Sequence, residues 1–485
     1  MPPRRRALLG HPLTSLLAAV AILGCAWALL VPPWQSPDEN AHFAYAQYLV
    51  EELDLPGETG RPLFSSEQQL ANDRSNADQT AQILATKPSW SDAEYEDWRR
   101  DDRALESGKR ADGGGPNPAR TNPPLYYGIA GAAYGLASGG DVFDRLYLMR
   151  LLSVVLLLVT VAATWALAAE LLPGDRRLAL AAAGVAGLQP MASFISASVT
   201  PDALLFALWA LALWLGARII GRGPALGTAA ALGAVIGLAV LTKATSYALV
   251  PAAGLALLVG VARHRPAARG RAALAVGAAA LAFAVPAGGW LVTARALDRP
   301  AVNQIAGASA ASKDPSPREF ASYLWQFYLP RLPFQEQIPI AAGLPVHDTW
   351  VKTGWAAFGW LEVRFPNPVY AVLALLSLAA LALGAFALVR AGPEQRLTLA
   401  FLALAALALL AGLHWTEYLS FVRTGEPFNQ GRYLLPLLPA MGVLTAAAVG
   451  LLSPRRRAVA VPVLLGGLFA LELLSLGLVA GRFYA

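Results

Sequence analysis

The side chains best suited to chemistry follow the first long apolar stretch, where the chain reads Pro37-Asp38-Glu39-Asn40-Ala41-His42. A helix that begins at Pro37 places Asp38, His42 and Tyr45 on one face, because residues four and seven positions apart lie on the same side of a helix. A carboxylate in such a stripe can accept a proton from a hydroxyl as a general base. Alternatively, Asp38 only stabilises the helix N-terminus through the helix dipole, by about 0.3–1 kcal/mol. Spacing alone leaves both interpretations open.

Glu39 has a structural interpretation that Asp38 lacks. Residues 36–39 and 316–319 share the pattern Ser-Pro-x-Glu, which is typical of a helix start: serine caps the helix, proline occupies its first turn and glutamate completes a capping box. The pattern favours Glu39 as a cap over Glu39 as a catalyst. His42 is more typical of a hydrogen-bonding neighbour than of a metal ligand, and no zinc-ligand spacing is present.

The elements that must position these side chains are membrane helices. Of the 485 residues, 56% are hydrophobic and 14% charged, which excludes an ordinary soluble domain. The net charge of +6 lies in clusters beside apolar stretches and does not indicate nucleic-acid binding. The single cysteine, Cys25, rules out an intramolecular disulfide. Stretches of about 18–24 apolar residues predict about eleven transmembrane helices, at residues 12–33, 147–171, 178–197, 203–221, 226–242, 244–262, 272–294, 367–389, 397–413, 433–452 and 459–480.

Arginine predicts the orientation, because basic residues accumulate in cytoplasmic loops. Arginines precede the first predicted span and recur in every second connection, for example at Arg176 and Arg177 and again at Arg455 to Arg457. The N-terminus is therefore expected in the cytoplasm. An odd number of crossings then places the C-terminus and the Asp38 segment on the non-cytoplasmic face.

Two long connections, residues 34–146 and 295–366, lie on that outer face, and loops of this length are usually functional. Residues 125–136 are apolar but too short to cross a bilayer, which predicts a helix in the membrane interface. The aromatic stretch at residues 320–330 predicts a second one. The sequence thus predicts an all-α polytopic membrane protein, with a core at residues 1–452 that includes both outer segments and a cytoplasmic turn and last helix at residues 453–485.

Three basic residues depart from the cytoplasmic pattern, because Lys243, Arg331 and Arg432 lie at the outer ends of predicted spans. Snorkelling toward the lipid headgroups explains any one of them. A phosphate held at the membrane surface explains all three together, since guanidinium and ammonium groups both bind phosphate.

These motifs, in this order, resemble a bacterial membrane family named domain of unknown function 2142. The resemblance rests on the segments Pro37-Asp38-Glu39 with His42, Asn122-Pro123-Pro124-Leu125-Tyr126-Tyr127, Leu241-Thr242-Lys243 and Gln430-Gly431-Arg432-Tyr433. It covers nearly the whole chain, from Arg4 to Leu452. The family in turn resembles the GT-C glycosyltransferases, multi-span enzymes that take sugar from a polyprenyl-phosphate carrier on the non-cytoplasmic face.

The resemblance implies roles for individual residues. Asp38 is the expected catalytic base, with Glu39 as the second candidate. The expected substrate-binding residues line the cavity or hold the carrier phosphate. They are His42, Tyr126, Tyr127, Lys243, Gln430, Arg432 and Tyr433, together with Arg331, which is added for its position at the outer end of a span and not for the resemblance. The expected partners are a polyprenyl-phosphate-linked sugar, membrane lipids and an unidentified glycan, lipid or protein acceptor. No cofactor or metal site is expected, because a single phosphate permits but does not require a divalent metal.

The resemblance also implies a location and an outcome. The protein is expected in the cytoplasmic membrane of a bacterium, in cell-envelope glycan synthesis, with inversion at the anomeric carbon. Two other classes of function are compatible with the spans. A lipid or glycan transporter also uses many spans, but it typically carries polar groups at mid-membrane, where only Glu472 is charged here. A non-catalytic scaffold would use the outer segments for docking, and it would still work with Asp38→Asn.

Overall fold

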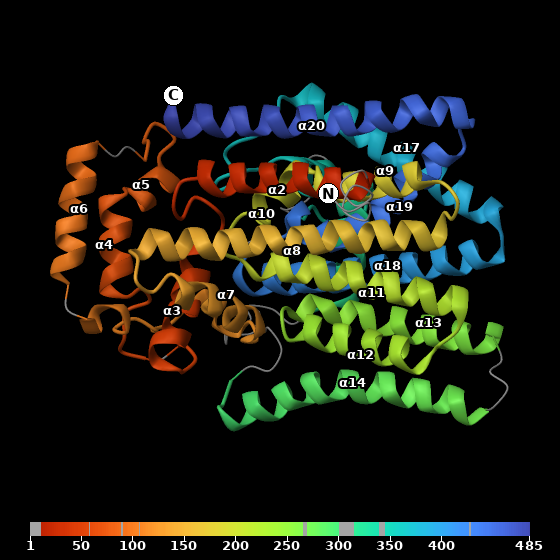
Figure 1. Cartoon of the computed structure of the whole chain (residues 1–485), viewed down its shortest axis with the longest axis horizontal. Helices are drawn as coiled ribbons and strands as arrows, with labels where there is room; N and C mark the ends of the chain where they lie inside the picture. Colours follow the sequence, from red (N-terminus) through yellow and green to blue (C-terminus); the bar gives the residue numbers. More distant parts are fainter. Residues whose placement is uncertain are drawn as a thin grey trace, which may run out of the picture.

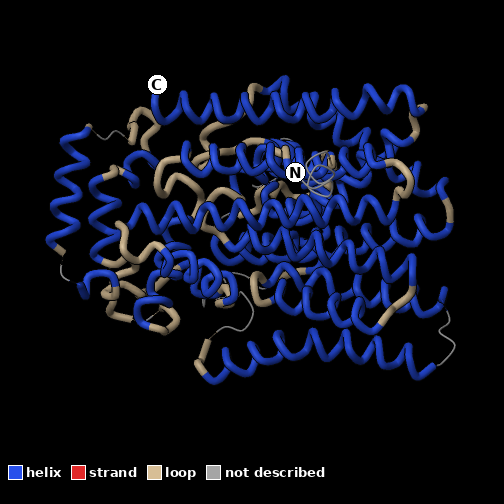
Figure 2. Tube along the Cα trace, in the orientation of Figure 1, coloured by secondary structure: helices blue, strands red, loops and turns tan. Residues whose placement is uncertain are grey.

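The computed structural model describes residues 11–57, 59–88, 91–105, 107–264, 269–299, 315–338, 345–425 and 428–485. Its long helices run side by side, and the short helices of the first long connection gather at one end of this bundle (Figure 1). The described residues form no strand (Figure 2). One isolated bridge joins Phe358 to Val363. The predicted all-α fold is confirmed.

The described helices follow one another along the chain without any intervening sheet. They are α2 (Pro12–Leu30), α3 (Glu39–Glu52), α4 (Ser66–Arg74), α5 (Ala77–Gln82), α6 (Asp92–Ala104), η1 (Ser107–Arg110), η2 (Pro118–Thr121), α7 (Leu125–Leu136), α8 (Val142–Leu171), α9 (Arg176–Gly187), α10 (Pro190–Ile195), α11 (Pro201–Arg222), α12 (Leu226–Val240), η3 (Ala244–Ala248), α13 (Leu249–His264), α14 (Arg269–Ala296), α15 (Pro317–Tyr328), η6 (His347–Lys352), α16 (Thr353–Trp355), α17 (Asn367–Ala391), α18 (Pro393–Thr424), η7 (Gly431–Leu437), α19 (Leu438–Gly450) and α20 (Pro454–Tyr484).

Nine helical stretches of the described chain are long and apolar enough to cross a membrane, and each corresponds to one of the predicted spans. The other two predicted spans are shorter helices. α12 has 15 residues. The predicted span at 178–197 is divided into α9 and α10 before Pro190, because proline lacks an N–H and restricts the residue that precedes it. The exact number of crossings stays a prediction.

The first and last described helices, α2 and α20, agree with an odd number of crossings. The Tyr484 hydroxyl donates to the Leu30 carbonyl at 2.9 Å, so α20 ends where α2 ends. We call this end of the bundle the Asp38 end; it also carries the described residues between 34 and 141. We call the opposite end the Arg455 end. The two ends lie left and right in Figure 1. Which side of the membrane each end faces stays a prediction.

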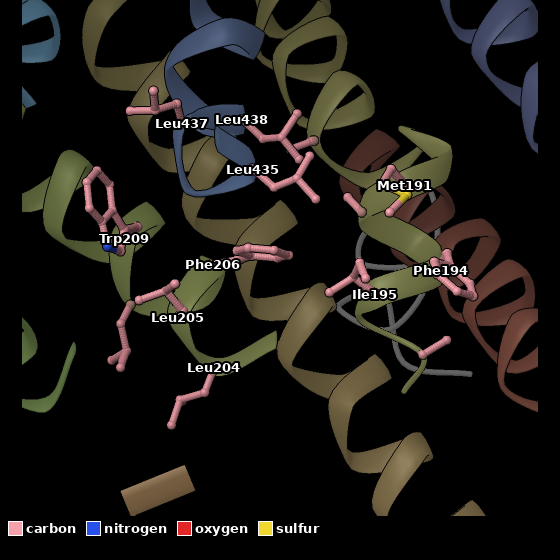
Figure 3. Packing of buried hydrophobic residues seen from close by; sticks show 14 of the residues in the cluster. Met191, Phe194, Ile195, Leu204, Leu205, Phe206, Trp209, Leu435, Leu437 and Leu438 are labelled. Carbon is pink, nitrogen blue, oxygen red and sulfur yellow. The ribbon is translucent and has the colours of Figure 1, made fainter. Parts of the chain in front are cut away.

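α11 forms the centre of the bundle. In its most apolar stretch 83% of the residues are buried, against 17% in α17, so α17 has the character of a lipid-facing helix. One hydrophobic cluster joins α10 and α11 to η7 and α19, through residues that include Phe194, Phe206, Leu435 and Leu438 (Figure 3). This packing fixes η7 against α11.

The intramembrane carboxylate expected at Glu472 is an interhelical hydrogen-bond partner. Trp27 Nε1 donates to it at 2.7 Å and Ser193 Oγ at 2.5 Å. These bonds join α20 to α2 and α10, and they satisfy a polar group that is completely buried.

The two short helices expected in the outer segments are present. α7 has the predicted bounds of residues 125 and 136, and α15 begins at Pro317, at the predicted Ser-Pro pattern. The predicted cap by the Ser316 side chain is wrong, because that side chain makes no capping bond. α7 packs against α3 and α8. It therefore connects the Asp38 segment to the long helix α8.

Candidate functional site

Asp38 forms the corner between α2 and α3. Its φ of 62° is left-handed, and the helix begins only at Glu39, so the predicted start at Pro37 and the cap by Ser36 are wrong. The left-handed turn at Asp38 separates Ser36-Pro37 from the helix. The Asp38 side chain makes no capping bond. Instead it is 51% exposed, and its Oδ2 lies 3.1 Å from Arg432 Nη2.

Glu39 is completely buried and does not form the predicted capping box. Oε1 accepts from Arg150 Nε at 2.8 Å and from Val199 N at 3.0 Å. Oε2 accepts from Arg150 Nη2 at 2.5 Å and from Trp34 N at 3.2 Å. A carboxylate has about four lone-pair sites, so these bonds leave Glu39 no oxygen for a substrate.

Lys243 pairs with Asp202, a residue that the sequence analysis missed. Lys243 Nζ lies 2.6 Å from Asp202 Oδ1, and Asp202 is 4% exposed in the first turn of α11. The available signal was the dipeptide Pro201-Asp202, which repeats Pro37-Asp38 at the same end of the bundle. A second carboxylate therefore lies in the candidate site.

Tyr433 joins the two ion pairs. Lys243 Nζ lies 5.3 Å from the centre of its ring and Arg432 Cζ lies 5.2 Å away, distances at which cations are attracted to an aromatic face. We call Asp38, Asp202, Lys243, Arg432 and Tyr433 the charge cluster. It combines residues from the start of α3, α11, the end of α12 and η7, so distant parts of the chain meet there.

Arg432 Nε, a buried polar atom of the charge cluster, has no hydrogen-bond partner within the described chain, and neither has the buried Oε1 of Gln430, two residues earlier in the sequence. Unsatisfied buried polar atoms are uncommon in native proteins, and each requires a partner such as water or a ligand. One is a donor and the other an acceptor. A ligand with both an anionic group and a hydroxyl can satisfy them.

His42 and the tyrosines form a buried network beside Asp38. His42 Nδ1 lies 2.9 Å from the Tyr127 hydroxyl, which also accepts from Asn122 Nδ2 at 3.1 Å. Tyr45 stacks on Tyr127 with ring centres 3.6 Å apart, and the Tyr126 hydroxyl lies 3.4 Å from Ser153 Oγ. Burial lowers the pKa of His42 to about 4, with opposing effects from the charges of the cluster. His42 is therefore neutral at neutral pH.

The Arg432 segment is held from the second outer segment. The Gly431 N–H donates to Thr353 Oγ1 at 2.6 Å. A Cβ at Gly431 would lie 2.4 Å from Gly354 N, so only glycine permits this approach. Glu417 Oε2 accepts from the backbone N–H groups of Phe428 and Asn429 at 2.9 and 2.8 Å. These contacts fix the loop that precedes Arg432.

The structure does not bring Arg331 to the charge cluster. Arg331 is exposed after α15, and its Nη1 donates to the Gln335 carbonyl at 2.8 Å. The turn that follows α15 thus uses this cation locally. Within the described residues, no group of three or more His, Cys, Asp or Glu side chains could hold a metal ion.

Two cavities flank the Lys243 segment. One of about 550 Å³ lies between η3, α13 and α18; Lys243, Thr416, Phe428 and Tyr433 line it together with apolar residues such as Leu409 and Leu413. The other, of about 690 Å³, lies along the apolar face of α7 and includes Leu152 and Leu241. The first therefore joins a charged end to apolar walls.

Comparison with known proteins identifies the type of fold. The oligosaccharyltransferase of Archaeoglobus fulgidus in its apo form is similar with a TM-score of 0.50 and 11% identity, over 97% of this chain and 56% of that one. ArnT from Cupriavidus metallidurans bound to undecaprenyl phosphate gives a TM-score of 0.44 and 18% identity, over 93% and 63%. This chain therefore spans less than two thirds of the length of either of these two structures. No curated protein matches the sequence.

The fold is similar to that of GT-C glycosyltransferases, the class to which these two enzymes belong. At such low identity the similarity concerns the fold alone. A family described as "Predicted membrane protein (DUF2142)" matches residues 21–441. The match includes every residue of the charge cluster, and the chain therefore belongs to the DUF2142 family of membrane proteins.

Proposed function

We propose that the protein is a glycosyltransferase that moves a sugar from a polyprenyl-phosphate carrier to an acceptor hydroxyl at the Asp38 end. One observation carries the proposal: an exposed carboxylate and a buried guanidinium meet at 3.1 Å, beside a second cation that lines a cavity with apolar walls. A transfer from a lipid phosphate requires a base, phosphate-binding cations and space for hydrocarbon. All three lie together here.

The carrier phosphate binds between Lys243 and Arg432, and its prenyl chain enters the 550 Å³ cavity. Buried cations are costly without partners, and Asp38 and Asp202 supply these partners to Arg432 and Lys243. The phosphate replaces Asp38 as the partner of Arg432. Asp38, on the exposed side of the pair, is then free to face the acceptor.

The chemical step is a single displacement. The acceptor hydroxyl gives its proton to Asp38 while its oxygen attacks the anomeric carbon. The bond between that carbon and the phosphate oxygen breaks, and its electron pair remains on the phosphate. Arg432 and Lys243 stabilise the additional negative charge, an effect that is strong where water is excluded. The product has the inverted anomeric configuration.

The remaining residues of the site orient the sugar. Gln430 Oε1 is a buried acceptor without a hydrogen-bond partner in the described chain, two residues before Arg432, and it binds a sugar hydroxyl. His42, Tyr126 and Tyr127 line the site beside Asp38 as neutral groups. Burial lowers the pKa of His42 and raises the pKa values of both tyrosines, so the imidazole is uncharged and the two hydroxyls stay protonated. No cofactor takes part, and we expect transfer to continue in the presence of EDTA.

Lipid-linked sugars in cells test the proposal. Cells without the protein should accumulate the unused donor. Expression of the unaltered protein in these cells should restore consumption of the donor. Asp38→Asn should not restore it, because the amide cannot accept the proton. Asp54→Asn is the matched control, since Asp54 is an exposed aspartate just beyond the other end of α3.

Two results would contradict the proposal. The first is full consumption of the donor in cells with a correctly inserted Asp38→Asn protein. The second is an unchanged set of lipid-linked sugars after loss of the protein, which would favour transport or a scaffold. Retention of configuration in the product would exclude the single displacement.

A further inference from the structure

Asp38 has a left-handed backbone conformation, which is uncommon outside glycine, and its neighbour holds it there. Residues other than glycine rarely have a positive φ, and they keep it where the surroundings impose it. The Asp38 side chain contributes no capping bond. The constraint comes from Glu39, whose four hydrogen bonds fix the chain immediately after Asp38.

Arg150 connects Glu39 to the end of the first helix. Besides its two bonds to Glu39, it donates to the carbonyls of Ala28 at 2.9 Å, Val31 at 2.6 Å and Pro32 at 3.0 Å. Both members of the ion pair are completely buried. Arg150 thus closes α2 and aligns the turn that carries Asp38 with α8.

Glu39 also connects the two halves of the charge cluster. Its Oε1 accepts from Val199 N at 3.0 Å, and Val199 precedes Asp202 by three residues, just before α11. Glu39 is therefore next to Asp38 in the chain, and it also holds the turn that leads to Asp202. Asp38 contacts Arg432 and Asp202 contacts Lys243. A shift of Glu39 therefore changes the place of the Asp38 carboxylate relative to Asp202.

We propose that Glu39 and Arg150 are a positioning pair, which holds the Asp38 carboxylate against Arg432 and sets its place relative to Asp202 and Lys243. Only the effect on sugar transfer rests on the proposed function. The positioning itself is a property of the chain and can be measured without substrate.

A second buried ion pair provides a matched control. Glu67 Oε1 lies 2.5 Å from Arg145 Nη2, with exposures of 3% and 0%, and Arg145 precedes Arg150 by five residues on the same helix. Glu67 also accepts from Arg110 and Gln47. It anchors α4 and contacts no member of the charge cluster. The two pairs therefore share their chemistry and burial, but only one adjoins Asp38.

A cysteine introduced at position 38 reports the positioning. The background is the full-length chain with Cys25→Ser and Asp38→Cys, which has one thiol. A thiolate beside Arg432 is stabilised, so alkylation should have its midpoint below the ordinary thiol pKa of about 8.5. Adding Arg432→Gln should raise the midpoint by about one pH unit, which verifies that the thiol senses the guanidinium.

The decisive variants neutralise each pair without changing the net charge. Glu39→Gln with Arg150→Met should raise the alkylation midpoint of the introduced thiol as much as Arg432→Gln does. Glu67→Gln with Arg145→Met should leave it unchanged. Arg150→Lys keeps the charge but loses the two-pronged bond, and it should give an intermediate shift even if the double variant fails to fold. An unchanged midpoint in these Glu39 and Arg150 variants, or an equal shift from the Glu67 pair, would overturn the proposal.

The transfer measurement uses the chain with Asp38 intact. The Glu39→Gln, Arg150→Met protein should bind a sugar-free polyprenyl monophosphate within about threefold of the parent, because Lys243 and Arg432 remain, while donor consumption is lost. If the thiol midpoint shifts as expected but donor consumption continues, the positioning stands and the proposed role of Asp38 fails. The two failures are therefore distinguishable.

Discussion

Arginine is used in two different ways at the two ends of the bundle. At the Asp38 end, Arg145, Arg150 and Arg432 are each less than a tenth exposed, and each contacts a carboxylate. At the Arg455 end, Arg455 and Arg456 are exposed beside a shallow apolar surface. A guanidinium leaves water only where partners compensate for its lost hydration. The buried arginines therefore hold specific carboxylates in place, whereas Arg455 and Arg456 fit the basic cluster that the sequence predicts for a cytoplasmic loop.

Removal of a buried arginine should have the largest effect and sharpen this contrast. Arg150→Gln leaves the buried Glu39 charge without its partner, which should lower the free energy of unfolding by about 3–5 kcal/mol. Arg455→Gln should change it by less than about 0.5 kcal/mol. Thermal unfolding in one detergent measures both. Equal stabilities would show that burial does not distinguish the two ends.

The cations of the charge cluster should matter for activity. Arg432→Gln removes a group that stabilises the departing phosphate, so donor consumption should fall by about 10²–10³-fold. The double variant Arg455→Gln, Arg456→Gln should consume the donor at the parent rate. A similar loss in the double variant would mean that the exposed arginines also serve the reaction.

The buried His42 should make the Asp38 end sensitive to acid. Its pKa is about 4 in the folded protein, against an ordinary value of 6.5, so the unfolded chain binds the proton more readily. Stability should therefore fall as the pH decreases from about 6.5 to 4, by up to about 3 kcal/mol, and no further below that range. His42→Gln should remove this component of the acid-induced loss in unfolding temperature. His264→Gln, at the Arg455 end, should retain it.

Replacements that test backbone conformation should have the smallest effect on stability. The difference in stability between the Gly and the Ala variant should have opposite signs at the two ends. Position 38 has a φ of 62°, so Asp38→Gly should be more stable than Asp38→Ala by about 1 kcal/mol. Arg456 lies in a helix, where Ala is favoured over Gly by about 1 kcal/mol. Chemical denaturation of the four variants measures both differences. If the Ala variant were the more stable one at both positions, the left-handed backbone conformation of residue 38 would be contradicted.

Local pattern predicted the elements well where local physics decides them. α7 has its expected bounds because residues 125–136 are apolar between turn-forming segments, and α15 begins at its Ser-Pro pattern. The same pattern failed at Ser36-Pro37, because Glu39 is drawn into the bundle by Arg150, from a helix more than a hundred residues away. A capping motif cannot reveal such a partner.

The sequence by itself determined an all-helical membrane protein with carboxylates and cations near the ends of its spans, because hydropathy and charge act through composition and short spacing. Only the tertiary structure decided which charges meet. It paired Asp38 with Arg432, added Asp202 to Lys243, enclosed Glu39 and left Arg331 on the surface. Those choices depend on how helices distant in the chain pack against one another, and ion pairing across such distances has no local signature.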